Sequence, residues 1–280
     1  PAINAFLPEI FPQDKLVKIN SLIATSGQFA YFIGPVIAGI LLNIISVEIL
    51  FVWDALSFLL AAIVLMTIHY SDKVGESISG SQLQKLKSGF DYLITNKSIG
   101  LLIMLTIMNN IFIMGPAIVG MPIMIKYYLH GSASDFAFVE AGMALGMLTG
   151  TFFMYRFSKH FKNGFLLLLG MLWDGLTYAL FFWVQSVPMA LCIIIFHGMG
   201  IPIITISRTT ILQKYTPNRY HGRLFAMVHL AVSGMTAIST ALVGMMAEVI
   251  SIHIVFFVFG IGGTLTGLIG FFKSDIQNFK

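Results

Sequence analysis

The sequence has few charged residues and almost no cysteine, and both scarcities limit what the chain can be. Charged residues make up 10% of its 280 residues, whereas soluble domains carry about 25%. Hydrophobic residues make up 57%, and the mean hydropathy is +0.89. Because a water-soluble monomer needs a polar exterior, this composition excludes a soluble globular fold and predicts a membrane protein.

Motifs for disulfide, metal and hydrolytic chemistry are also lacking. The one cysteine, Cys192, excludes an internal disulfide and any metal site built on cysteine spacing. No histidine is followed directly by glutamate, as H-E-x-x-H requires, and no G-x-S-x-G occurs. We therefore expect no enzyme, no cofactor and no metal site. The start, Pro1-Ala2-Ile3, has neither a methionine nor a basic-then-apolar leader, which is typical of a fragment or a trimmed chain.

Long apolar stretches dominate the rest of the chain. A helix needs about 20 mostly apolar residues to cross the hydrocarbon core of a bilayer. Eight stretches qualify, and none contains a lysine or arginine: Ile19–Ile45, Ile49–His69, Ile99–Ile125, Phe136–Met154, Phe165–Val184, Pro188–Ser207, Leu224–Ile250 and Ile252–Phe272. They are too long and too continuous for the strands of a membrane barrel. The sequence therefore predicts an all-α membrane protein with eight transmembrane helices.

The basic residues divide the connections between these stretches into two alternating sets. One set holds 15 of the 16 lysines and arginines: Pro1–Lys18, Tyr70–Ser98, Tyr155–Gly164, Arg208–Arg223 and Lys273–Lys280. The other set holds only Lys126. Because insertion retains basic loops in the cytoplasm, we expect a protein of the bacterial plasma membrane with both chain ends cytoplasmic. Topology and anionic headgroups account for these charges, so we expect the lipid bilayer, and not nucleic acid, as their partner.

The longest connection separates two groups of spans. It begins with a Ser/Gly-rich stretch, which is typical of a flexible linker. Apolar residues then recur at helical spacing from Leu83 to Ile94, which predicts a short amphipathic helix at the inner membrane surface. The expected layout is a two-helix unit over residues 1–69, a cytoplasmic linker over 70–98 and a six-helix unit over 99–280.

Four short motifs carry a resemblance to a known family. Gly34-Pro35-Val36-Ile37-Ala38-Gly39 is similar to the G-P-x-x-G-G core of an antiporter motif. The other three are Asp54-Ala55-Leu56-Ser57-Phe58, Gly89-Phe90-Asp91-Tyr92-Leu93, and the set Gln213, Pro217, Gly222 and Arg223. On these motifs the chain resembles the major facilitator superfamily, and in particular its bacterial drug exporters of the macrolide-efflux type.

The resemblance implies a place for each helix and a function. The eight helices resemble the fifth to the twelfth of a twelve-helix transporter, whose first four helices would be missing partners. The antiporter motif is diluted, since glycines of the family pattern fall on Ser21, Ala30 and Ala38. The implied activity is efflux of small lipophilic substrates driven by protons, through alternating access. Export of a polar metabolite such as a siderophore, import of a nutrient, and a remnant that does not transport stay open as alternatives.

Small residues form two ridges at i, i+4 spacing. Ser26, Ala30, Gly34 and Ala38 form the first, which also contains Pro35 and Gly39 of the antiporter motif; Gly142, Gly146 and Gly150 form the second. Helices in lipid pack where small side chains let their backbones approach. We therefore predict that the two ridges face each other across the two halves of the transporter. Whether this contact gates the cavity or only packs the helices stays open.

Polar groups within the spans are the candidates for a substrate cavity. By resemblance, Asn109, Asn110 and Met114 lie on the seventh helix and His197 and Met199 on the tenth, both of which line the cavity in this superfamily. Ionisable residues within spans usually face the interior. Asp54 and Glu140 lie near the outer ends, where we expect an interfacial structural role. Asp174 lies near the midplane, on a helix expected to be peripheral, so we expect it to bond a neighbouring helix. His197 can exchange protons near neutral pH, and for it cavity function and buried structure stay open.

Overall fold

The chain folds into helices, and the computed structural model describes residues 2–41, 46–67, 82–272 and 274–279. The side chains of residues 2, 3, 5, 28, 31, 32, 34–41, 47, 82–86, 133 and 274 also lie outside the description. The elements are α1 (Ala2–Ile10), η1 (Gln13–Lys15), α2 (Leu16–Leu41), α3 (Val47–Met66), α4 (Gln82–Thr95), α5 (Lys97–Gly115), η2 (Pro116–Gly120), α6 (Met121–Ile123), η3 (Met124–Tyr128), α7 (Ala133–Phe157), η4 (Ser158–His160), α8 (Asn163–Ala179), η5 (Leu180–Trp183), α9 (Val187–Tyr215), α10 (Asn218–Val249), α11 (Ile252–Phe271) and α12 (Ser274–Gln277). No strand occurs within these described ranges.

Seven of the eight expected membrane-spanning helices are found among the described residues, and the all-α membrane fold is confirmed. Seven helices among the described residues are long and apolar enough to cross a bilayer, and each coincides with one of the expected stretches. The eighth expected stretch, Ile19–Ile45, is helical as α2 up to Leu41, while its residues 42–45 lie outside the described residues. α2 itself is not among the seven.

One expected connection is much shorter than the charge pattern predicts. α9 continues to Tyr215 and α10 begins at Asn218, so the expected loop Arg208–Arg223 is reduced to two residues. Lysine and arginine are good helix formers, so they end a span in the membrane without ending the helix. Thr216 and Pro217 have extended backbones and form the break, because proline disfavours a helical residue before it.

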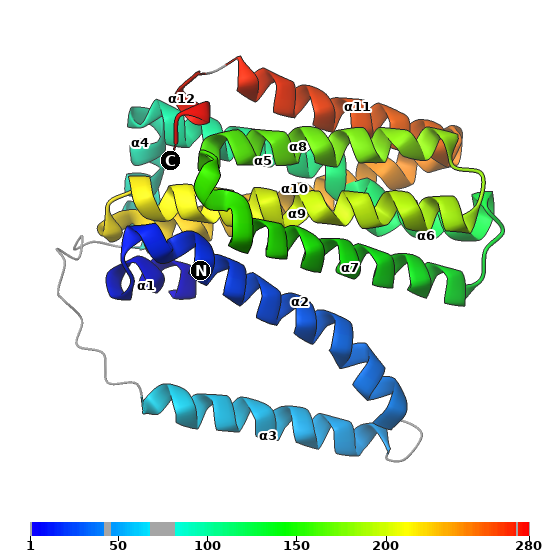
Figure 1. Ribbon diagram of the computed structural model, residues 1–280, viewed down its shortest axis with the longest axis horizontal. Helices are drawn as coiled ribbons and strands as arrows, with labels where there is room; N and C mark the ends of the chain where they lie inside the picture. The colour runs from blue at the N-terminus through cyan, green and yellow to red at the C-terminus, as the bar shows by residue number, and fades with distance from the viewer. Residues whose placement is uncertain (1, 42–45, 68–81, 273, 280) are drawn as a thin grey trace.

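The helices α5 and α7 to α11 form one bundle of roughly parallel and antiparallel rods (Figure 1). α7 packs on α9, α8 packs between α9 and α11, and α10 packs on α5. The turn between α7 and α8, the turn between α9 and α10, and both chain termini lie at the same end of the bundle (Figure 1). We call this the basic end, because it gathers the basic connections. The connection that carries Lys126 lies at the opposite end.

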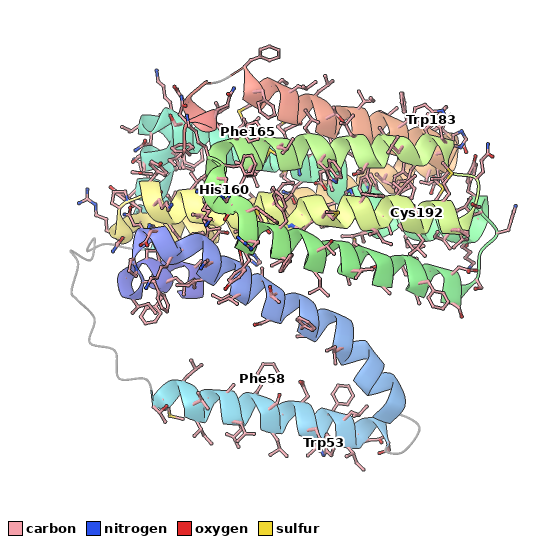
Figure 2. The ribbon with its side chains drawn as sticks, viewed as in Figure 1. Trp53, Phe58, His160, Phe165, Trp183 and Cys192 are labelled. Atoms are coloured by element: carbon pink, nitrogen blue, oxygen red, sulfur yellow. The ribbon has the colours of Figure 1, made fainter. Side chains whose placement is uncertain are left out.

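α2 and α3 extend away from the bundle. α2 packs against α7 and α9 near its start and then diverges, and α3 runs apart from the bundle (Figure 1). Every side chain of α3 from Phe51 to Met66 is exposed, including Trp53 and Phe58, which Figure 2 labels. A helix as apolar as α3 tolerates this exposure in lipid, where burial against other helices gives little hydrophobic gain.

The glycine ridge of α7 faces α9, so the predicted contact between the two small-residue ridges is wrong. A Cβ added to Gly146 would fall on the backbone of Ile195 and Gly198, and one added to Gly142 or Gly150 would also meet α9. Gly198 faces back onto the α7 backbone. The spacing thus identifies a close helix approach correctly, but i, i+4 spacing does not specify which helix approaches.

The described small residues of α2 that were expected to meet this ridge, Ser26 and Ala30, do not do so. Ser26 and Ala30 are exposed, and Gly27 between them has no neighbouring atom within 4 Å of an added Cβ. Gly34, Pro35, Ala38 and Gly39 have a helical backbone, but their side chains lie outside the described residues. The described part of α2 instead contacts α7 through Val17 and Ala24, which pack on a small cluster of buried apolar side chains.

A serine of α10 interrupts the hydrogen-bond ladder of α5. The Gly115 N–H donates to Ser239 Oγ over 2.7 Å, and the Ser239 hydroxyl donates to the carbonyl of Ile111 over 2.5 Å. Pro116 follows and begins a π-helical turn. A side chain inserted into the ladder, together with a proline that lacks an N–H, is a known cause of helix distortion. The helix is therefore distorted at Gly115-Pro116.

The amphipathic helix predicted in the linker is α4, and it packs on α10. Arg223 Nη1 donates to Ser88 Oγ over 2.9 Å, and the rings of Tyr92 and Tyr220 stack with centroids 4.5 Å apart. Partial burial raises the pKa of the Tyr92 phenol. Phe90 stays exposed on the other side of α4. The helix therefore presents one face to the protein and leaves an apolar side chain free to contact lipid.

Candidate transport cavity

A cavity of about 1200 Å³ lies between α5, α7, α8, α9 and α10, with Gly27 of α2 at its edge. It is larger than the ~300–1,000 Å³ of usual small-molecule sites. Most of its lining side chains are apolar. The polar ones are Asn109, Asn110, Glu140, Asp174, Tyr178, His197, Thr205 and Arg208. The polar groups come from four helices, so only the folded bundle brings them together.

A buried carboxylate, an imidazole and an amide meet in this cavity. His197 Nε2 lies 3.4 Å from Asp174 Oδ1, and Asn109 Nδ2 donates to Asp174 Oδ2 over 3.2 Å. All three side chains are buried, with at most 5% of their surface exposed. The cluster joins α5, α8 and α9, and buried ionisable groups of this kind are costly unless paired.

Thr177 and Tyr178 hold the imidazole in place. Thr177 Oγ1 lies 2.9 Å from His197 Nδ1 and within 3.0 Å of the carbonyls of Trp173 and Asp174. The ring of Tyr178 stacks on the imidazole with centroids 3.8 Å apart and planes 7° apart. The imidazole therefore has one face covered, one nitrogen bonded to Thr177 and the other nitrogen directed to the carboxylate.

The geometry accommodates two proton arrangements. In the first arrangement, the Thr177 hydroxyl donates to a backbone carbonyl and His197 Nδ1 donates to Thr177. Nε2 of the neutral imidazole then has no proton and faces Asp174 Oδ1 as an acceptor. A hydrogen bond across that 3.4 Å gap requires one proton between the two atoms. If the hydroxyl instead donates to Nδ1, the proton on Nε2 fills the same gap. In either arrangement one proton can lie between Asp174 Oδ1 and His197 Nε2.

Arg208 lines the cavity, although the charge pattern predicts that it begins a loop. It lies on the same face of α9 as His197, Ile201 and Thr205, spaced by about one helical turn each, and it lines the cavity nearer the basic end. No carboxylate within the described part of the chain lies within 4.0 Å of its guanidinium. His197, Thr205 and Arg208 are spaced by whole helical turns, and this spacing, followed past the predicted end of the span at Ser207, could have identified Arg208 as a cavity residue.

Buried amides join α1 and α2 to α9 at the basic end. Asn20 Nδ2 donates to Thr210 Oγ1 over 3.1 Å and to Gln213 Oε1 over 2.7 Å. Gln213 Nε2 in turn donates to the carbonyl of Asn4 over 2.9 Å. Asn20, Thr210 and Gln213 are all buried. These bonds hold the first helices of the chain against the six-helix bundle.

The structure brings most of the expected cavity residues together. Asn109, Asn110, Met114 and His197 line the cavity, and Glu140 does so as well. Asn110 also donates from its amide to the carbonyl of Thr106 on its own helix over 2.9 Å.

Met199 and Asp54 lie elsewhere. The Met199 backbone packs where α9 approaches Gly150 of α7, and the residue is not part of the cavity lining. Asp54 lies on the exposed helix α3, also outside the lining.

The expectation that the helix of Asp174 is peripheral is wrong. Most residues of α8 are buried, and Gly175 packs directly on the backbone of α11. Asp174 does bond a neighbouring helix, through Asn109, and it also faces the cavity. Apolar composition alone does not separate a helix surrounded by lipid from one surrounded by other helices. As for metals, no cluster of three or more His, Cys, Asp or Glu side chains within the described ranges could hold an ion.

The chain is similar to membrane transporters over nearly its whole length. A family model described as "Transmembrane secretion effector" matches residues 1–279. The uncharacterized MFS-type transporter YfmI of Bacillus subtilis is 21% identical over 99% of this chain and 69% of its own length. Macrolide efflux protein A is 21% identical in two bacteria. The match covers 90% of this chain and 63% of the protein from Streptococcus pyogenes, and 81% and 71% for that from Enterococcus faecalis.

A solved structure has the same fold. The crystal structure of a bacterial homologue of iron transporter ferroportin in outward-facing state superimposes with a TM-score of 0.73 and 16% identity. The match covers 95% of this chain and 66% of that one. The chain thus spans about two thirds of the length of these proteins. With a family model matched from end to end and a shared helical architecture, the chain belongs to the transmembrane secretion effector family of the major facilitator superfamily of membrane transporters.

Proposed function

We propose that the protein exports small lipophilic compounds in exchange for protons, by alternating access. The observation that carries this proposal is the combination of a large, mainly apolar cavity with one buried Asp174–His197 pair inside it. An apolar wall with few polar groups suits a lipophilic substrate. A carboxylate–imidazole pair inside a membrane bundle is the kind of site at which transporters bind a proton.

Each polar residue has a role in the proposal. Asp174 and His197 share the transported proton, Asn109 fixes the carboxylate, and Thr177 fixes the imidazole. When the pair carries the proton between its two atoms, Asp174 Oδ1 and His197 Nε2 are bonded to each other and the cavity wall is less polar. Loss of the proton leaves an unpaired polar group in a medium of low dielectric constant, which favours the conformation that opens the pair to water. Arg208 and Glu140 provide further polar contacts for the substrate.

The direction of export rests on the relatives and on the charge pattern. Two relatives are named macrolide efflux protein A, which supports efflux of a lipophilic drug. We place the basic end in the cytoplasm of a bacterial cell, with both chain ends there and the protein in the plasma membrane, because basic connections are retained inside. In the proposed cycle, the bonds of Asn20 to α9 close the cytoplasmic side, and they separate when the cavity opens to the cytoplasm.

The organisation of the chain is part of the same proposal. Residues 1–69 act as one unit, residues 70–98 as the linker and residues 99–280 as the six-helix unit that holds the cavity. The two units move relative to each other about the contacts of α1 and α2 with α7, α9 and α10. This agrees with rigid-body rocking around a central site, as in transporters built from two halves.

The test compares two Asp→Asn substitutions. Accumulation of a labelled macrolide is measured in bacteria that express the protein, the Asp174→Asn variant or the Asp54→Asn variant, with and without a proton uncoupler. Both aspartates lie in membrane-spanning helices, but only Asp174 lines the cavity. We expect low accumulation with the protein and with Asp54→Asn, and high accumulation with Asp174→Asn or with the uncoupler.

The result also separates the two parts of the proposal. Efflux that continues when the proton gradient is removed would contradict proton coupling. Equal accumulation in cells with and without the protein would contradict macrolide export. Membrane levels of the three proteins, measured by immunoblot, show whether each reaches the membrane.

A further inference from the structure

A second cavity, of about 690 Å³, lies at the basic end, away from the transport cavity. It forms where the turn between α7 and α8 meets the start of α2 and the end of α9; Figure 2 labels His160 in this turn. Its basic lining residues are Lys18, Arg156, Lys159, His160, Lys162 and Lys214. Asp14 is the one carboxylate among its described lining residues. We call this cavity the basic cleft, and its size is that of a small-molecule site.

The charge of the basic cleft is not neutralised by its described lining residues. Five permanent cations face one carboxylate, which leaves a net charge of +4 when His160 is neutral. Lys18 and Arg156 contact aromatic faces, with centroid distances of 5.4 Å to Tyr155 and 5.6 Å to Phe157. Like charges around one concave surface repel each other more strongly than in open water, so an anion bound between them is favoured.

Polar groups at the start of α8 complete the cleft. Lys162 is the N-cap of the 17-residue helix α8 and provides no side-chain cap. The Gly164 N–H donates to the carbonyl of Phe279 over 3.0 Å, and the positive end of the helix dipole lies beside the cleft. Asn163, the residue after Lys162, also lines the cleft and is 4% exposed, and its Oδ1 atom accepts no hydrogen bond. A ligand that carries an anion and a nearby hydroxyl donor matches both features.

The surroundings of the cleft favour a lipid over a soluble anion. The cleft lies at the ends of three membrane-spanning helices, α7, α8 and α9. Phe157 and Phe161, beside the basic residues, are 41% and 46% exposed. Tyr155, which lines the cleft, is 39% exposed, and tyrosine is enriched where a membrane meets water. Basic pockets between spanning helices bind phospholipid headgroups. We propose that the basic cleft binds the headgroup of an anionic phospholipid with a hydroxylated headgroup, such as phosphatidylglycerol.

In this site the phosphate bridges separate parts of the fold. Lys18 belongs to α2, Lys159 to the turn between α7 and α8, and Lys214 to the end of α9. A phosphate among them draws α2 towards the six-helix bundle at the same end as the amide bonds of Asn20. The bound lipid therefore stabilises the closed arrangement of the basic end.

The test measures lipid binding to the purified chain by native mass spectrometry in an uncharged detergent. Phosphatidylglycerol is titrated against phosphatidylcholine with the same acyl chains, and inorganic phosphate is added as a competitor. The test variant is Lys18→Gln/Lys159→Gln/Lys162→Gln. The matched control is Lys87→Gln/Lys97→Gln/Lys126→Gln, which removes the same charge from exposed lysines outside the cleft.

We expect phosphatidylglycerol to bind more tightly than phosphatidylcholine, and the test variant to weaken it by roughly 100-fold, since each lysine near an anionic surface contributes a factor of roughly five. The control variant should weaken it by less than about threefold, as expected for screened charges at a distance. Asp14→Asn removes the one carboxylate in the described lining and should tighten binding by roughly threefold to fivefold. A misfolded protein would not show that gain.

Three results would overturn the assignment. An equal loss of phosphatidylglycerol binding in the test and control variants would show that the lipid is attracted to basic residues in general and not to the cleft. Displacement of the lipid by millimolar inorganic phosphate, with equal binding of phosphate alone, would show a site for soluble phosphate. Unchanged binding in both the test variant and Asp14→Asn would show that the lipid binds elsewhere.

Discussion

The close approach of α7 and α9 at Gly146 leads to a quantitative prediction for Gly146→Ala. The added Cβ would lie 3.0 Å from the Gly198 Cα and would fall on the carbonyl of Ile195. Carbon atoms in contact prefer about 3.5–4.0 Å, so the helices would have to separate by about 0.5–1 Å. Both obstructing groups are backbone atoms, which cannot rotate away as a flexible side chain can.

The expected loss of stability follows from overpacking. Inserting a methyl group into a tightly packed interior costs about 1–3 kcal/mol. Alanine in a helix also gains about 1 kcal/mol over glycine. Gly234→Ala is the matched control for that gain, because Gly234 is also helical and has no atom within 4 Å of an added Cβ. Relative to this control, Gly146→Ala should lower the free energy of unfolding by about 1–3 kcal/mol.

Thermal unfolding of the purified variants in detergent measures the difference. At about 2–4 °C per kcal/mol, Gly146→Ala should unfold roughly 2–12 °C below Gly234→Ala. If Gly146→Ala unfolds at the same temperature as Gly234→Ala, or above it, α7 and α9 are not in backbone contact at this position. The reasoning about the glycine ridge would then be refuted.

Three further substitutions test other contacts by the same unfolding measurement. Ser239→Ala removes the hydroxyl that joins α10 to the α5 ladder and should cost about 1–2 kcal/mol; no change would mean that α5 closes its own ladder there. Asn20→Ala and Gln213→Ala should show a coupling energy of about 0.5–3 kcal/mol in a double-mutant cycle, whereas additive effects would argue against their direct bond. Tyr178→Phe should be neutral or stabilising by up to about 1 kcal/mol, because the buried Tyr178 hydroxyl has no hydrogen-bond partner among the described residues. Tyr178→Leu, which loses the stack on His197, should destabilise by a further ~0.5–1.5 kcal/mol, and equal stability of the two variants would contradict the stacking.

The course of each span could be predicted because the bilayer acts on every helix separately. The stretch predicted as Ile99–Ile125 is found from Lys97 to Tyr128, through two π-helical turns, because an apolar run long enough to cross the hydrocarbon core forms a helix in lipid whatever its neighbours. The end of α9 shows where this reasoning stops. Membrane insertion responds to Arg208 as a charge, whereas the helix itself continues to Tyr215 until Thr216 and Pro217 break it.

The candidate site was predictable only in part. Asn109 and His197 could be proposed from the sequence, because polar groups in apolar spans usually face the interior. The sequence placed Asp174 on a peripheral helix, whereas the structure brings it to both residues. Thr177 and Tyr178 were not proposed, since hydroxyl and aromatic side chains are common in membrane helices.

The sequence by itself determined that the chain is dissolved in lipid, which stretches form its spans, and which connections share one end. Those properties depend on the transfer of single segments from water to lipid, and composition is enough to decide them. Only the tertiary structure decided which helix the glycines of α7 approach and which side chains meet Asp174. These depend on the rotation and the neighbours of each helix, and in lipid no difference in hydrophobicity between one neighbour and another specifies them.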